Sequence, residues 1–171
     1  MELNRDQLLE ALGELDAELA GMGVKAVLHV IGGAAIALKY NENRSTADVD
    51  SLFDQYGVVR RAIDAVADRR GLPRNWVNSQ VHDLGLPLER DTQAERMVIG
   101  PNLTLIIASA EFLLFTKLIA TRQADQDFED AVILARYLGL STPADIEQAV
   151  RHFGSIDGPV ELLIEDIAEE L

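Results

Sequence analysis

The pair Gly32-Gly33 is the feature that most restricts how this chain can fold. It follows the apolar, β-branched run from Val24 to Ile31, which is typical of a largely buried strand. The small, apolar segment from Ala34 to Tyr40 comes next and is compatible with a helix. Glycines at such a turn let the backbone approach a ligand closely, and the start of a helix offers N–H groups to a phosphate. The sequence therefore predicts a strand, a glycine turn and a short helix in that order.

Two aspartates, Asp48 and Asp50, lie in the next predicted strand, which runs from Asp48 to Phe53 after a polar loop from Asn41 to Ala47. Side chains two apart in a strand share one face, so both carboxylates point the same way. Their α-carbons would lie roughly 7 Å apart. At an effective dielectric of about 20, charges at that distance repel by roughly 2 kcal/mol. Solvent at an acidic strand end or a bound cation would relieve the repulsion, and Mg²⁺ suits a site of one or two carboxylates.

The rest of the chain predicts helices around a hairpin. Leucines at helical spacing precede Gly21, and Val58 to Arg70 has the same periodicity. We expect irregular structure from Leu72 to Arg96. A hairpin is predicted by the two apolar runs around Gly100, Met97 to Ile99 and Leu103 to Ala108. Capping residues and prolines predict helices in the remaining part. Their expected positions are after Ser109, Asp127 to Tyr137, Thr142 to Phe153, and Gly158 to Leu171.

These elements predict an α+β or α/β-like fold, a small mixed sheet flanked by helices. We expect residues 1–108 to form the core and residues 109–171 to form a helical part that completes the active site within one compact unit. There is no run of about 18 apolar residues, so no transmembrane helix is expected. The polar amino terminus does not resemble a signal peptide. The chain has no cysteine, which excludes disulfides and thiolate zinc sites. A cytoplasmic location is expected.

The charge of the chain limits its partners. Its 29 acidic residues outnumber its 15 lysines and arginines, for a formal net charge of −14. Binding nucleic acid through its phosphates requires a dense basic surface, so non-specific nucleic-acid binding is not expected. The acidic surface keeps the protein soluble or meets a basic partner. One cluster of arginines could still form a local basic patch: Arg60, Arg61, Arg69, Arg70 and Arg74.

The order of motifs resembles the DNA polymerase β-like nucleotidyltransferase superfamily. There, a Gly-Gly or Gly-Ser turn precedes an Asp-hydrophobic-Asp strand, as Gly32-Gly33 precedes Arg44-Ser45-Thr46-Ala47-Asp48-Val49-Asp50 here. The Arg-x-Thr-x-Asp-x-Asp form is similar to a bacterial branch that includes AbiEii-type toxins and an uncharacterised DUF6036-type group. Trp76-Val77-Asn78 is similar to a Trp-Leu-Asn element of that group. The tail also resembles it, in Lys117-Leu118-Ile119-Ala120-Thr121-Arg122 and Asp127-Phe128-Glu129-Asp130.

This resemblance implies a metal-dependent enzyme that uses an NTP. Asp48 and Asp50 would hold Mg²⁺, with Mn²⁺ as a substitute. The groups implied to contact the nucleotide are Gly32, Gly33, Arg44, Ser45, Thr46 and Lys117. The implied acceptor is a macromolecular hydroxyl, in the toxin branch often the 3′ end of a tRNA, with a cognate antitoxin as partner. The acidic balance leaves a protein or small-molecule acceptor open.

The helical tail carries the least settled assignments. Lys117 supplies a point charge suited to a phosphate, or it snorkels to solvent from an amphipathic helix. Asp127 supplies a third carboxylate for the acceptor hydroxyl or the metal, or it is an N-cap. Asp125 competes for that role, because Gln123 to Gln126 lengthen the interval from Lys117. Classical members of the superfamily carry this acid on a later strand, and neither predicted hairpin strand contains one.

Other residues favour simpler interpretations. His29 alternates within an apolar strand and is expected in the core or at a strand edge, and Trp76 is expected to be a packing anchor. A dinucleotide-dependent enzyme is disfavoured, because Gly32-Gly33 matches neither a Walker loop nor a dinucleotide fingerprint. The main competing hypothesis is a catalytically inactive module of the same fold that binds a basic protein.

Overall fold

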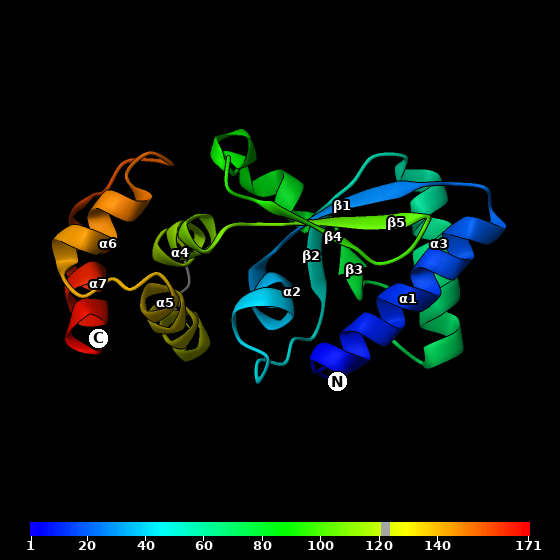
Figure 1. Ribbon diagram of the computed structural model, residues 1–171, viewed down its shortest axis with the longest axis horizontal. Helices are drawn as coiled ribbons and strands as arrows, with labels where there is room; N and C mark the ends of the chain where they lie inside the picture. The colour runs from blue at the N-terminus through cyan, green and yellow to red at the C-terminus, as the bar shows by residue number, and fades with distance from the viewer. Residues whose placement is uncertain (121–123) are drawn as a thin grey trace. The chain divides into compact units, whose positions relative to one another are not determined.

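A mixed sheet organises the first of two units into which the chain divides, Met1–Gly85 with Ala94–Ile107. The computed structural model describes residues 1–120 and 124–171. Within these residues the sheet has five strands in the order β3-β2-β1-β5-β4 (Figure 1). The strands are β1 (Ala26–Ile31), β2 (Val49–Leu52), β3 (Val77–Asn78), β4 (Glu95–Val98) and β5 (Leu103–Ile107). β1 is parallel to β5 and antiparallel to β2, β2 is parallel to β3, and β4 is antiparallel to β5. The predicted mixed α/β fold is therefore confirmed.

The central strand, β1, is buried at four of its six residues, and its exposed residues share one face. Leu28 and Val30 are fully buried, whereas Val27 is 42% exposed and His29 is exposed as well. Most of the strand is thus buried, as predicted, but the placement of His29 in the core or at a strand edge was wrong. Because β1 is apolar at most positions, its sequence did not indicate that the face with Val27 and His29 would be exposed to solvent. That depends on where the helices pack.

Helices α1 (Arg5–Gly21) and α3 (Tyr56–Arg70) lie side by side in unit 1, as Figure 1 shows, and α1 also contacts β5. α1 buries the predicted leucine stripe, and α3 ends at Gly71 in the left-handed region, with φ 67°. The predicted short helix is present, but it begins at the glycine pair itself rather than after it. This helix, α2 (Gly32–Ala35), continues as a π-helical turn, η1 (Ile36–Tyr40).

The connection after α3 is largely irregular, as predicted. It holds the two-residue strand β3 and the 3₁₀ turns η2 (Gln80–Leu84) and η3 (Leu88–Arg90). The hairpin of β4 and β5 is confirmed, but β4 begins at Glu95, two residues before the predicted start. The expectation that neither hairpin strand carries an acid was therefore wrong.

The second unit, Leu86–Gln93 with Ala108–Leu171, is helical in its described residues. Its helices are α4 (Ala110–Leu118), α5 (Asp125–Tyr137), α6 (Pro143–Val150) and α7 (Gly158–Glu169). Ser109 and Thr142 cap α4 and α6 through hydrogen bonds to the backbone, as predicted. α6 ends at Val150, before the predicted end at Phe153. The ring of Phe153 packs edge-on against Phe112, with centroids 5.2 Å apart. No helix in the described ranges is long and apolar enough to cross a membrane.

We predict that Trp76→Phe destabilises the fold. The Trp76 side chain is fully buried, and its indole Nε1 donates a hydrogen bond of 3.0 Å to the carbonyl oxygen of Ile63. Phenylalanine loses this bond and leaves a void, so the free energy of unfolding should fall by about 1–3 kcal/mol. Urea unfolding followed by circular dichroism measures the change, because the variant has no tryptophan fluorescence. Leu84→Ala, at a side chain 67% exposed, is the control and should change little. An unchanged unfolding midpoint in Trp76→Phe would contradict the packing role.

Candidate active site

The two aspartates lie where the alternation of β2 puts them. Asp48 comes directly before β2 and Asp50 lies within it, and both are half-buried, while Val49 and Ser51 between and beyond them are buried. The carboxylates thus share the less buried face of the strand. Asp50 pairs with Ile31 on β1 and with Asn78 on β3, so it has a neighbour on either side in the sheet.

Gly32 makes room for Asp50. It directly follows Ile31, the residue opposite Asp50, and has a φ of 66°, a conformation that favours glycine. A Cβ atom at this position would lie 2.9 Å from Oδ2 of Asp50. Any side chain here would therefore be strained and would push the carboxylate away. The position of the Asp50 side chain therefore depends on a glycine at residue 32.

Gly33 has a similar relation to the segment before Asp48. A Cβ atom on Gly33 would lie 3.0 Å from Oγ1 of Thr46 and 3.1 Å from Nη2 of Arg44. Thr46 is 5% exposed, and its hydroxyl donates a hydrogen bond of 3.0 Å to the carbonyl oxygen of Asp48. The Arg44 guanidinium donates to the carbonyl oxygen of Ser45. These contacts fix the backbone that leads into the aspartate pair.

Asn78 belongs to this site, although sequence reasoning gave it no role. Its amide Nδ2 donates a hydrogen bond of 3.1 Å to Oδ2 of Asp48, and its Oδ1 accepts one of 3.2 Å from the backbone N–H of Gln80. Asn78 is 6% exposed. Buried amides are nearly always hydrogen-bonded, so a lone Asn in the apolar Trp-Val-Asn run was a usable signal. The sequence did not indicate which residue the Asn78 amide would bond.

The electrostatics of the pair are unfavourable without a cation. Burial raises the pKa of Asp48 above its ordinary value, and the charge of Asp50 raises this pKa further. The hydrogen bond from Asn78 opposes both effects, because it stabilises the ionised form. Two half-buried carboxylates that share a face therefore attract a positive ion.

The donor set suits Mg²⁺ better than a metal that needs a full protein cage. In the part of the chain that the structure describes, no group of three or more His, Cys, Asp or Glu side chains could hold a metal. Mg²⁺ is commonly held by one or two carboxylates together with water and substrate phosphates. Asp48 and Asp50 fit that description.

Glu95, the acid found on β4, does not join this pair. β4 lies three strands from β2 in the sheet order, roughly 14 Å at the usual strand spacing. The Glu95 carboxylate instead forms an ion pair of 2.9 Å with Lys39. On β3, the strand next to β2, the residue that contacts Asp48 is the amide Asn78 and not a third acid.

Unit 2 holds a separate charged cluster around Lys117. The Nζ atom of Lys117 lies 2.7 Å from Oδ1 of Asp127 and 3.0 Å from Oδ2 of Asp130. The Lys117 side chain is 12% exposed and that of Asp130 is fully buried, so Lys117 does not snorkel to solvent. Asp130 received no role from the sequence. Its spacing of three from Asp127 was the available signal, because such residues share a helix face.

The structure decides one alternative at the start of α5. The N-cap position is Ala124, so the interpretation of Asp127 as an N-cap was wrong; its carboxylate accepts a bond of 3.4 Å from the backbone N–H of Ala124. Asp125 is exposed at the first position of the helix. Arg122, which completes the Lys-Leu-x-Ala-x-Arg pattern, lies with Thr121 and Gln123 outside the described residues.

The candidate basic patch is largely neutralised by carboxylates. The Arg60 guanidinium donates a hydrogen bond to Asp64. Arg70 donates one of 2.9 Å to Glu14 and one of 3.3 Å to Glu10. Arg69 pairs with Glu18, and Arg74 lies 3.3 Å from Asp68. Arg69 and Arg70 thus tie α3 to α1, whereas the other two pair with acids of α3. Arginines paired in this way offer little charge to phosphates.

Comparison with protein families identifies the chain. Residues 7–140 match the model of a family described as "Nucleotidyltransferase of unknown function (DUF6036)". The chain belongs to this nucleotidyltransferase family. The match includes the glycine turn, both aspartates of β2, Asn78 and the Lys117 cluster. Comparison with curated proteins and with solved structures finds no match.

We predict that Asp48→Asn stabilises the metal-free nucleotidyltransferase fold at neutral pH. Because the pKa of Asp48 is raised by folding, its ionised form costs stability above that pKa, and the cost fades as the pH falls through it. Asparagine removes the charge and keeps an acceptor oxygen for Asn78. The melting temperature in EDTA should rise at neutral pH and change less in acid. Asp54→Asn, at an exposed acid beyond β2, should leave the melting temperature unchanged. A lower melting temperature for Asp48→Asn at neutral pH would refute the account.

We also predict that Asn78→Ala weakens Mn²⁺ binding without nucleotide. The variant leaves Asp48 without the amide that orients it, and loss of such an outer partner typically lowers metal affinity about 10–100-fold. Isothermal titration with MnCl₂ measures the affinity. Ser51→Ala is the matched control, because the Ser51 hydroxyl bonds the backbone oxygen of the same Asn78 without contacting Asp48. Equal losses in both variants would assign the effect to general disruption of β3.

Proposed function

We propose that this protein is a Mg²⁺-dependent nucleotidyltransferase that moves a nucleoside monophosphate from an NTP to a hydroxyl group. The observation that carries the proposal is the arrangement of Asp48 and Asp50 on one face of β2, with Gly32 shaped around the Asp50 carboxylate. Membership of a nucleotidyltransferase family gives this arrangement its chemical context.

The residues of unit 1 have distinct roles in the proposal. Asp48 and Asp50 hold the metal, and Asn78 keeps the Asp48 carboxylate oriented. When bound, Mg²⁺ neutralises charge that spreads over the phosphate oxygens during phosphoryl transfer. The backbone N–H groups of the glycine turn, together with Ser45 and the Arg44 guanidinium, contact the triphosphate. Thr46 contributes mainly through its backbone, since its hydroxyl already bonds the carbonyl of Asp48.

For unit 2 the proposal rests on the chemistry of its charged cluster. Asp127 accepts the proton of the acceptor hydroxyl, and as this carboxylate is neutralised the Lys117 ammonium, paired in the free protein, becomes available to a phosphate group. The buried Asp130 carboxylate lies 3.0 Å from the same ammonium and helps to hold it in place. A lysine held by two carboxylates keeps its position in the absence of substrate, which favours a preorganised site.

The acceptor we propose is a macromolecular hydroxyl, with the 3′ end of a tRNA as the first candidate. The protein would then act as the toxin of a toxin–antitoxin pair, with a cognate antitoxin as partner. The neutralised arginines of α3 argue against a broad nucleic-acid surface. Recognition would therefore depend on the end of the RNA rather than on long tracts of its backbone. Because the net charge of the chain is −14, a protein or a small molecule is the alternative acceptor.

Label transfer tests the proposal. The protein is incubated with each α-³²P-labelled NTP, Mg²⁺ and either total RNA or a cell lysate. We expect label to move to one class of acceptor with the wild type and to fall to background with Asp48→Asn or Asp50→Asn. Asp54→Asn is the matched control and should retain full transfer. Transfer that persists in both site variants would place the chemistry elsewhere.

A second candidate is a catalytically inactive module of the same fold that binds a basic protein. The net charge of −14 and the amide of Asn78 beside Asp48, where β3 could have carried a third acid, favour it. Its signature in the same experiment is Mg²⁺-NTP binding without transfer to any acceptor. A binding assay with labelled NTP, run alongside the transfer assay, therefore separates the two functions.

A further inference from the structure

One face of the mixed sheet is open to solvent beside the aspartate pair. Residues paired across neighbouring strands point to the same side, so the strand registers place the side chains of this open face in two rows. The first row is Leu52, His29, Ile106 and Arg96, from β2, β1, β5 and β4. The second row is Val27, Thr104 and Val98, from β1, β5 and β4. All of these residues belong to unit 1.

Apolar side chains of the open face are not covered by the helices. Val27 is 42% exposed and Val98 is 70% exposed, while Leu52 and Ile106 are half-buried. The opposite face is closed, since Leu28, next to Val27 on β1, is fully buried. Uncovered apolar surface gains free energy when hydrocarbon or an aromatic ring lies against it. The open face therefore favours a ligand with flat or apolar groups.

The open face is cationic although the chain as a whole is acidic. Arg96 and His29 are exposed on it. Lys25 lies just before β1 and falls on the same side as His29 by alternation. The side chains of Arg96 and Lys25 have no carboxylate partner among the described residues. None of the residues in the two rows is acidic, although the chain has 29 acidic residues. The open face therefore suits an anionic ligand.

This face begins directly beside the aspartate pair. His29 lies diagonally across from Asp50, because it pairs with Leu52, the residue two places further along β2. Diagonal neighbours of an antiparallel pair are roughly 7–8 Å apart, so a ligand on His29 lies next to the Asp50 carboxylate. Arg96 lies two strands beyond His29, roughly 10 Å away at the usual strand spacing. A chain that crosses the open face from Arg96 to His29 therefore ends at the aspartate pair.

A single strand of RNA carries the groups that this face is suited to bind. Its phosphates pair with arginine and lysine, and its unpaired bases stack on histidine rings, guanidinium planes and apolar side chains. The bases of a duplex are stacked on one another inside it and do not reach a sheet face. Because the open face offers only two permanent cations, it favours a short segment at the end of a strand.

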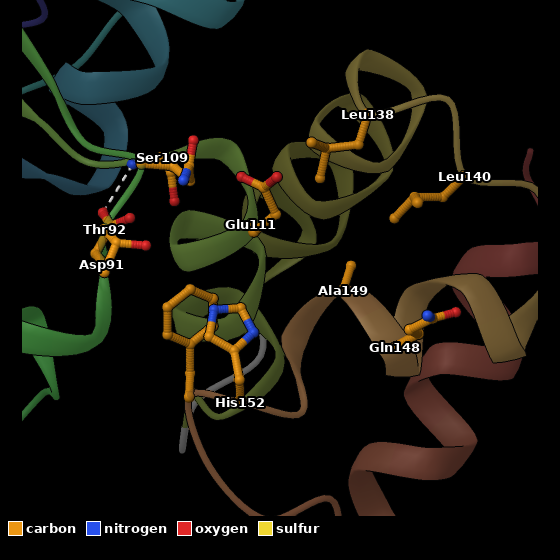
Figure 2. Close-up of a pocket in the computed structure, with 11 residues that line it drawn as sticks. Asp91, Thr92, Ser109, Glu111, Leu138, Leu140, Gln148, Ala149 and His152 are labelled. Carbon is orange, nitrogen blue, oxygen red and sulfur yellow. Dashed lines mark hydrogen bonds between the residues drawn. The ribbon is translucent and has the colours of Figure 1, made fainter.

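The cavity of unit 2 does not fit the same ligand. Figure 2 shows Asp91 and Glu111 on its walls, and its described lining contains no lysine or arginine. Asp91 accepts a hydrogen bond of 2.9 Å from the backbone N–H of Ser109, as the dashed line marks. An anion would meet these two carboxylates without a permanent countercharge. The phosphates of an RNA strand therefore favour the open face.

We propose that the open face of the sheet binds single-stranded RNA. The bases stack on His29 and on the apolar residues, and the phosphates pair with Arg96 and Lys25. The 3′ end of the strand then lies at the aspartate pair, where the proposed transfer takes place. This assignment of the acceptor rests on the proposed function, but the binding itself needs no NTP and is measured apart from transfer.

Fluorescence anisotropy tests the proposal with the full chain and MgCl₂ but without NTP. The probe is a short single-stranded RNA that ends in CCA and carries fluorescein at its 5′ end. We expect saturable binding, and about tenfold weaker binding of the same RNA in a blunt-ended duplex. Equal affinity for both RNAs, or no binding of the single strand, would overturn the proposal, whether or not label transfer is observed.

The same samples test a second copy of the chain as the occupant. Sedimentation velocity should find no self-association through the open face, so Val98→Asp should leave the sedimentation coefficient unchanged. A dimer that dissociates in Val98→Asp would assign the open face to a second copy and contradict the proposal.

Variants locate the RNA on the sheet. His29→Ala should weaken binding about tenfold, within the range found for the loss of one stacked base. Arg96→Gln removes one phosphate contact, so the slope of log affinity against log salt should become about 0.7 less steep. Arg61→Gln, at an exposed arginine of α3 outside the open face, is the matched control and should bind as the wild type does. Unchanged binding in both His29→Ala and Arg96→Gln, or an equal loss in Arg61→Gln, would refute this location.

Discussion

The contact between the Gly32 backbone and the Asp50 carboxylate is the constraint on which the candidate active site depends. Antiparallel pairing of β1 with β2 sets Ile31 opposite Asp50, so the chain must turn away from the strand immediately beside a carboxylate. A Cβ atom there would displace the Asp50 carboxylate, and glycine adopts the positive φ without strain. The turn, the start of α2 and the position of the Asp50 carboxylate are thereby determined together.

That geometry places like charges close together in a partly buried position. Burial and mutual repulsion raise the pKa of Asp48, and the amide of Asn78 offsets part of the cost. Such an arrangement is unfavourable for stability alone, which is typical of a site arranged for a ligand rather than for folding. A cation between the two acids would convert the repulsion into attraction.

Charge elsewhere in the chain is mostly committed to structure. The arginines of α3 bond acids of α1 and of α3 itself, and Lys117 is held between Asp127 and Asp130. At the pair on β2, by contrast, Asp48 accepts its hydrogen bond from the neutral amide of Asn78, which leaves the negative charge of the pair in place. This is the charge that the proposed metal ion would neutralise.

Local sequence patterns determined most elements of this protein. Alternation put Asp48 and Asp50 on one face, the glycine pair ended the strand, and Ser109 and Thr142 marked the helix starts, because each of these depends on neighbours within a few residues. The tertiary structure alone decided which strands lie side by side. β3 joins β2 after the α3 crossover, and this brings Asn78 to Asp48 across 30 positions of sequence. The exposure of His29 likewise depends on which face of the sheet the helices cover. Such contacts depend on chain topology, and no periodicity within a single element encodes it.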